Sequence, residues 1–190
     1  MRFARFGLLV FVCGLMLSPG IGAQTVAMPS VAPDACTIAP AESPLPGYEG
    51  DLNAPSPTPT PLPPTATDPA DAETAATIIE RIAMSIACEN AGDLPRMLGN
   101  FSPSWIEARF SGYDLVFAQR YMEAAASPQP LDDENLIELI AVTDITVSPD
   151  GIAFATVTTV RNGIEHVDML ILVSKDGGWL IDGAQAVVTD

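Results

Sequence analysis

IAFATVTTVRNGIEHVDMLILV, residues 152–173, is the stretch that determines the fold. It contains two runs of β-branched and apolar residues, and Asn162-Gly163 separates them. Both residues of an Asn-Gly pair accept a positive φ, which the tightest hairpin turns require. The stretch therefore predicts two antiparallel strands, 152–161 and 164–174, joined by a two-residue turn.

Further turn signals on both sides extend this hairpin into a larger sheet. Ser148-Pro-Asp-Gly151 precedes it and Lys175-Asp-Gly-Gly178 follows it. They predict two more strands, 136–147 and 179–188, and hence a curved four-stranded antiparallel meander. Side chains alternate along a strand, so one face of the sheet is expected to pack on the rest of the domain. From the first and third strands that face collects Ile137, Leu139, Ala141, Ile145, Val147, Val167, Met169, Ile171 and Val173.

The residues before the sheet have helical periodicity. Asp68 is placed to cap a long helix that continues to about Asn90. Shorter helices are expected at 93–98, 104–112 and 115–126. Helices first and a meander afterwards predict one α+β domain, at residues 70–190.

The N-terminus has the composition of a secretory signal. Arg2 and Arg5 precede the uncharged run FGLLVFVCGLML at 6–17, and Ser-Pro-Gly ends that run. A membrane-spanning helix needs about 20 apolar residues, so the run is too short to remain as an anchor. We expect residues 1–23 to be removed after Ala23 and the protein to be secreted or extracytoplasmic.

Residues 24–69 are expected to form a disordered tether rich in Pro, Thr and Ser. Of the 18 prolines, 12 lie between Pro29 and Pro69, and few apolar side chains accompany them. Without the signal peptide the chain has six basic and 24 acidic side chains, and so a net charge of −18. Such a charge repels nucleic acid and anionic membrane surfaces, so neither is expected as a partner.

Two cysteines, Cys36 and Cys88, remain after removal of the signal peptide. An oxidising compartment makes an even number of cysteines readable as a disulfide. On the long predicted helix Cys88 lies more than about 100° from the centre of the apolar stripe, so it faces away from the sheet. A passing segment that carries Cys36 could reach it there. The residues favour a bridge, and two free thiols are the alternative.

Three stretches carry a resemblance to a known fold, namely Ala87-Cys-Glu-Asn-Ala-Gly-Asp-Leu94, Phe101-Ser-Pro-Ser-Trp105 and Gly177-Gly-Trp-Leu-Ile-Asp182. They resemble the NTF2-like superfamily, the SnoaL-like or cystatin-like α+β roll that nuclear transport factor 2 and ketosteroid isomerases share. The resemblance implies a pocket between the curved sheet and the helices. In some members this pocket performs acid-base chemistry with an aspartate in a motif after the helices. Residues 100–105 contain no acid here, so no catalytic residue is transferred.

The sequence offers one weak catalytic group. His166 is the only histidine, and in its strand it shares a face with Asp168. A histidine and an aspartate on one face can form a general base and the carboxylate that orients it. The other face of that strand is the more apolar one, which predicts His166 toward solvent, a dimer contact or the rim of the pocket. No cofactor is expected, because the sequence lacks the motifs of metal and phosphate sites.

These observations favour a binding module. Its expected partner is a small hydrophobic ligand or a protein, held in the pocket or on a sheet surface. An isomerase or dehydratase is the first alternative, and it requires His166 and Asp168 to line one cavity together with a tyrosine, either Tyr113 or Tyr121. A structural domain that forms a homodimer through its sheet is the second alternative.

Overall fold

The computed structural model describes residues 28–41, 67–110, 121 and 123–187. The predicted signal peptide, residues 42–66 of the predicted tether and most of the predicted helix at 115–126 lie outside this part. Of that last helix, Tyr121 and residues 123–126 are described, and they are helical.

The helical part precedes the sheet, as predicted. It contains α1 (Ala72–Asn90), α2 (Leu94–Leu98) and α3 (Pro103–Phe110), with short 3-10 helices η1 (Pro33–Ala35) and η2 (Asp133–Asn135) on either side. The predicted cap of the long helix is wrong by three residues. Asp71 is the cap, and its carboxylate accepts a hydrogen bond of 2.8 Å from the amide of Thr74. Asp68 instead belongs to a short strand.

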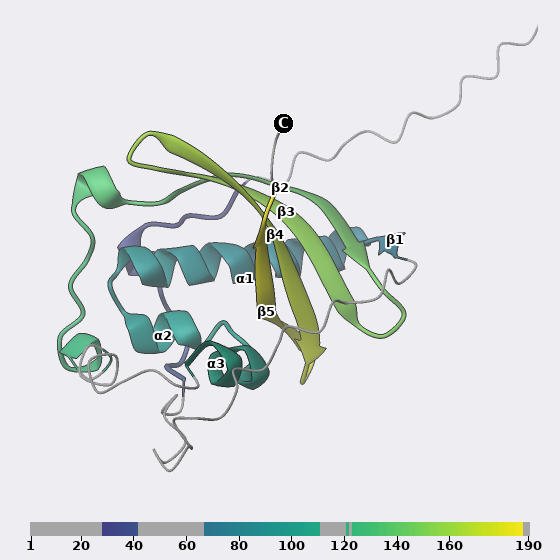
Figure 1. The fold of residues 1–190 in the computed structure, drawn as a ribbon, viewed down its shortest axis with the longest axis horizontal. Coiled ribbons are helices and arrows are strands. Elements are labelled where there is room, and N and C mark those ends of the chain that lie inside the picture. Colours follow the sequence, from purple (N-terminus) through teal and green to yellow (C-terminus); the bar gives the residue numbers. More distant parts are fainter. Residues whose placement is uncertain (1–27, 42–66, 111–120, 122, 188–190) are drawn as a thin grey trace, which may run out of the picture.

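The sheet contains the four predicted strands and one that was not predicted. They are β1 (Asp68–Pro69), β2 (Glu138–Val147), β3 (Ile152–Arg161), β4 (Ile164–Lys175) and β5 (Gly178–Ala186). All neighbours are antiparallel and the order is β1-β2-β3-β4-β5. The β3–β4 turn has positive φ at Asn162 (54°) and Gly163 (72°), as the Asn-Gly signal predicts. Figure 1 shows the strands crossing α1, with α2 and α3 below α1 in this view.

The core lies between α1 and one face of the sheet, here called the inner face. Ile78, Ile79 and Ile82 of α1 contact a sheet cluster made of Val142, Ala153, Ala155, Val157, Leu172 and Ile181, with Leu170 packed against it. On β4 the predicted face is therefore wrong, because Leu170 and Leu172 face the helix instead of Met169 and Ile171. Their partners on β3 are Ala155 and Ala153, which leave room for leucines beneath α1.

On β2 the alternation is interrupted twice. The register with β3 shifts between Leu139 and Ala141 and again between Thr143 and Thr146, where Asp144 has a φ of 52°. A bulge adds one residue and thereby reverses which side chains face inward. Val142 takes the inner position predicted for Ala141, and the second bulge restores Ile145 and Val147 to the inner face.

Residues 28–41, here called the strap, pack on the helices. A disulfide joins Cys36 to Cys88 (S–S 2.08 Å), so the predicted bridge is present. Cys88 does lie off the sheet-facing stripe, but the strap buries it completely. The amide of Ala41 donates a hydrogen bond of 2.9 Å to the carbonyl of Pro95. The folded unit therefore begins well before residue 70.

Candidate functional site

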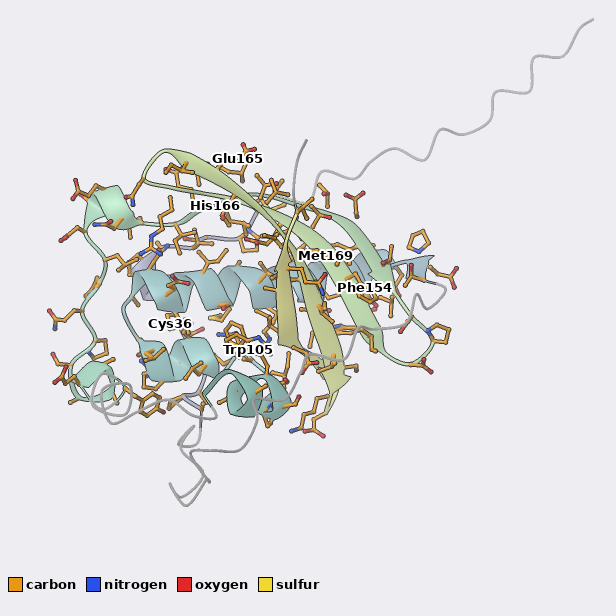
Figure 2. All side chains as sticks on the ribbon, in the orientation of Figure 1. Cys36, Trp105, Phe154, Glu165, His166 and Met169 are labelled. Atoms are coloured by element: carbon orange, nitrogen blue, oxygen red, sulfur yellow. A yellow bond between two sulfur atoms is a disulfide. The ribbon has the colours of Figure 1, made fainter. Side chains whose placement is uncertain are left out.

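The helix-facing side of β4 carries the two residues that the sequence singled out. Leu170 and Leu172 face α1, so His166 and Asp168, at even positions of the same strand, lie on the inner face as well. The sequence assigned the other face of β4 to the helices, so the predicted face of His166 is wrong, but the side chain is exposed, in agreement with the predicted position toward solvent. Figure 2 shows His166 and Glu165 on opposite sides of the strand, with His166 nearer α1. His166 is exposed and Asp168 is partly buried.

Near Asp168 the inner face of the sheet is lined on the β5 side by small side chains. Asp168 pairs with Ala186 across β4 and β5, and Leu170 pairs with Ala184. Paired residues of antiparallel strands share a face, so these four side chains form one surface, here called the inner shelf. Both alanines are exposed, and among residues 28–41, 67–110, 121 and 123–187 nothing covers them. Their small side chains leave space directly above the sheet.

The carboxylate of Asp168 is the unusual group on the inner shelf. It is partly buried between apolar neighbours, yet it forms no hydrogen bond or ion pair within residues 28–41, 67–110, 121 and 123–187. The same holds for the imidazole of His166. Polar groups that lose water on folding normally acquire a partner, because an unpaired one is costly. Asp168 is therefore free to accept hydrogen bonds from a ligand.

An ion pair lies at the hairpin end of the inner face. Arg161, at the end of β3, reaches Glu89 of α1 with an Nη1–Oε1 distance of 3.3 Å. Burial raises the pKa of the Glu89 carboxyl, and the charge of Arg161 opposes that effect. The pair holds the β3–β4 hairpin against the C-terminal part of α1, next to the strand positions of His166 and Asp168.

Tyr121 lies in a different cluster. It packs with Leu98 and Ile106, and its hydroxyl donates a hydrogen bond of 3.5 Å to the carbonyl of Ala41 in the strap. Burial raises its pKa, and the nearby Asp93 raises it further. Among the described residues no contact joins Tyr121 to the His166–Asp168 pair. Tyr121 is thus not brought together with this pair, and Tyr113, the other tyrosine considered for an isomerase-like site, lies outside the described residues.

A second polar group was missed by the sequence analysis. Ser102 and Ser104 both donate hydrogen bonds to the Oδ1 atom of Asp182, the bond from Ser104 being 2.8 Å long. Ser102 also accepts a hydrogen bond of 3.0 Å from the amide of Trp105, so it caps α3, a role predicted for Ser104. The single histidine of the chain lies on β4, so these serines have no histidine base. The cluster fixes α3 to β5.

Two further features are absent from the described residues. No three of their His, Cys, Asp or Glu side chains are grouped closely enough to hold a metal ion. None of their helices combines the length and the hydropathy needed to cross a bilayer.

Comparison with known proteins gives one family. The model of a family described as "Putative lumazine-binding" matches residues 75–183, which is more than half of the chain. No curated protein and no solved structure matches. The family has an NTF2-like, SnoaL-like fold, so the fold implied by the resemblance is confirmed. The matched range contains most of α1, the strands β2, β3 and β4, and Asp168 and Leu170 of the inner shelf, whereas Ala184 and Ala186 lie just beyond it. Because the match covers more than half of the chain, the chain belongs to this lumazine-binding-like family.

Proposed function

We propose that this protein is an exported module that binds a small, flat, largely apolar ligand on the inner shelf. The observation that carries the proposal is the carboxylate of Asp168, which is partly buried and unpaired among the described residues, beside two exposed alanines. Binding sites for small molecules combine apolar walls with a few placed polar groups. The inner shelf has this composition.

The family description points to the chemical class of the ligand. Lumazine is a planar two-ring heterocycle with ring N–H donors and carbonyl acceptors. A ring of this kind could lie flat over Ala184 and Ala186 with an N–H group directed at the Asp168 carboxylate. Leu170 would contact one end of the ring. A charged acceptor makes a stronger hydrogen bond than a neutral one, so Asp168 would fix the orientation of the ligand.

Charge restricts the ligand further. The chain without residues 1–23 has a net charge of −18, and the inner shelf itself presents a carboxylate. An anionic ligand would be repelled by both. A neutral heterocycle with N–H donors is the class that these charges admit most readily, and His166 could contact its polar edge.

Export is supported by the N-terminus and by the cysteines. The uncharged run at 6–17 behind two arginines is typical of a cleaved signal peptide. A disulfide between Cys36 and Cys88 suits an oxidising compartment. We therefore propose that the ligand is met outside the cytosol.

The test is a titration of the exported protein with lumazine, in which the fluorescence of the ligand reports binding. Asp168→Asn keeps the volume but removes the charge, so affinity should fall about 10-fold to 100-fold, as expected for a hydrogen bond to a charged group. The matched control is Glu165→Gln, on the opposite face of the same strand, which should leave affinity unchanged. Equal affinity of the Asp168→Asn variant, or no binding by the parent protein, would refute the proposal.

A homodimer through the sheet has one supporting observation. The outer face of the sheet, turned away from α1, carries the partly exposed Phe154 and Met169 on neighbouring strands, and Figure 2 labels both. We propose this face as the dimer contact if a dimer forms. Met169→Lys should then convert the protein to a monomer in light scattering, while a protein that is monomeric from the start would end this second proposal.

A further inference from the structure

The side of α1 that faces away from the sheet forms a cleft with the strap. This cleft has a volume of about 270 Å³. Its lining is Thr37 and Ile38 from the strap and Thr77, Glu80, Arg81 and Met84 from α1. The four helical residues follow the spacing i, i+3, i+4 and i+7, so they occupy one stripe of the helix. The cleft is separate from the inner shelf, which lies on the other side of α1.

Arg81 is held in place by a buried amide. Asn100 is fully buried, and its Oδ1 accepts a hydrogen bond of 3.2 Å from Nη1 of Arg81. Its Nδ2 donates to the carbonyls of Arg96 and Met97, each at 3.2 Å. These bonds fix the rotation of the Asn100 amide and leave its oxygen directed at Arg81. The guanidinium is therefore oriented before any ligand arrives.

The charge on Arg81 has no direct ion pair. Two other arginines are paired, Arg96 with Asp93 at 2.7 Å and Arg161 with Glu89 at 3.3 Å. In the part of the chain that the structure describes, Arg81 has no carboxylate within 4.0 Å, and Asn100 is the one acceptor for its five donors. Burial lowers the pKa of Arg81, and the charge of Glu80 raises it again.

The cleft therefore presents one cation and one anion that do not neutralise each other by contact. We propose that it binds a small zwitterion of the amino-acid type. The ligand carboxylate would lie on Arg81, because a guanidinium matches a carboxylate with two parallel hydrogen bonds. Its ammonium would lie on Glu80, and its apolar side chain on Ile38 and Met84. A phosphate would meet the repulsion of Glu80 and of the net negative charge, and a simple cation would meet Arg81.

The disulfide is the covalent anchor of the strap wall, next to the residues that line the cleft. Thr37 directly follows Cys36, and its amide donates a hydrogen bond of 3.4 Å to the sulfur of Met84. Breaking the bridge removes the covalent anchor beside Thr37 and Ile38, so these two residues lose their fixed position against α1 although Val31 and Ala41 keep their hydrogen bonds. The cleft is thus expected only in the oxidised protein.

The experiment is amide-detected NMR of the exported, oxidised protein titrated with L-leucine. The result expected is saturable shifts at Thr37, Ile38 and Thr77. N-acetyl-L-leucine, which lacks the ammonium, and L-leucinamide, which lacks the carboxylate, should bind at least 10-fold more weakly. Reduction of the disulfide should abolish the shifts.

Two variants assign the charges. In Glu80→Gln the preference for L-leucine over N-acetyl-L-leucine should disappear, and in Arg81→Gln the preference over L-leucinamide should disappear. Glu73→Gln, an exposed acid in the first turn of the same helix, is the control and should keep both preferences. Glu80 is exposed as well, so its variant keeps the test valid if Arg81→Gln folds poorly.

Three results would overturn the proposal. They are the absence of saturable shifts with L-leucine, equal binding of all three probes, and preferences that survive both substitutions. Shifts on the inner shelf instead of the cleft would also count against it. The first three results leave lumazine binding by the inner shelf untouched, because the two sites share no residue.

Discussion

The side chain of Asn90 pairs with the backbone of Ile137 in both directions. The Ile137 amide donates to Oδ1 at 2.9 Å, and Nδ2 donates to the Ile137 carbonyl at 3.0 Å. The same Nδ2 also donates to the carbonyl of Val31 in the strap, at 2.8 Å. One buried amide thus joins the end of α1, the start of β2 and the strap.

Removing this amide should destabilise the whole domain. Asn90→Ala leaves the buried backbone groups of Ile137 without a partner, and each such group costs about 1–3 kcal/mol. We expect the free energy of unfolding to fall by about 3 kcal/mol in urea denaturation. Gln185→Ala, an exposed position on β5, should change it by less than about 0.5 kcal/mol. A similar loss in both variants would contradict the role of Asn90.

The disulfide should be a major source of stability. It closes a loop between residues 52 positions apart, and by the chain-entropy argument such a loop contributes about 4 kcal/mol. Cys36→Ser should lower the free energy of unfolding by this amount and free the strap without unfolding the sheet. A thiol count on the unreduced protein is the direct check, since two reactive thiols would show that the bridge is absent.

The two serines on Asp182 should differ in their effect. Ser102 is buried and caps α3, so Ser102→Ala should cost about 1–2 kcal/mol. Ser104 is exposed and makes no cap, so Ser104→Ala should cost less than about 0.5 kcal/mol. Thermal unfolding of the pair measures the difference. Equal destabilisation would mean that α3 is capped in another way.

The Glu89 carboxyl predicts a pH dependence of stability. Burial raises its pKa in the folded protein above the reference value of 4.5, so between the two values the folded state holds more protons than the unfolded one. The contribution of the protonated Glu89 carboxyl to the free energy of unfolding is fully present below pH 4.5. It is lost as the pH rises through the raised pKa of the folded protein. Glu89→Gln should therefore gain stability relative to the parent on going from pH 4 to pH 7.

Urea denaturation of both proteins across this range measures the effect. The charge of Arg161 opposes the rise of the Glu89 pKa. The Arg161→Gln variant should therefore lose stability over a wider pH range than the parent protein does. The side chains of Glu89 and Arg161 are 42% and 40% exposed, so solvent keeps the change modest. A Glu89→Gln variant that follows the parent at every pH would show that the carboxyl is not perturbed.

Local signals in the sequence predicted local structure. Asn162-Gly163 specifies its own turn, because the φ preference of two adjacent residues is enough to form it. The strands on either side followed from their composition. The face of β4 could not be predicted in this way, because Met169 and Ile171 on one side are as apolar as Leu170 and Leu172 on the other. Packing against β3 and α1 decides between the two faces.

The candidate site was predicted in part. Because side chains alternate along a strand, the sequence predicts His166 and Asp168 on one face of β4. It does not determine which face of β4 packs on the helices, and so not the side of the sheet on which the two residues lie. The link between Ser102 and Asp182 spans 80 residues, and no local pattern announces it. The roles proposed for Ala184 and Ala186 could not be predicted, because the exposure of these two side chains on the inner face depends on how the helices pack against the sheet.

The most direct measurement is an amide-detected NMR titration of the exported protein with lumazine, repeated on Ala184→Leu. We expect shifts centred on Asp168, Leu170 and Ala184 in the parent protein. The leucine introduced at position 184 fills the space over the inner face, so the shifts should be lost. Gln185→Leu introduces a leucine on the outer face and should leave the shifts intact. Shifts confined to the outer face, or unchanged binding by Ala184→Leu, would contradict it.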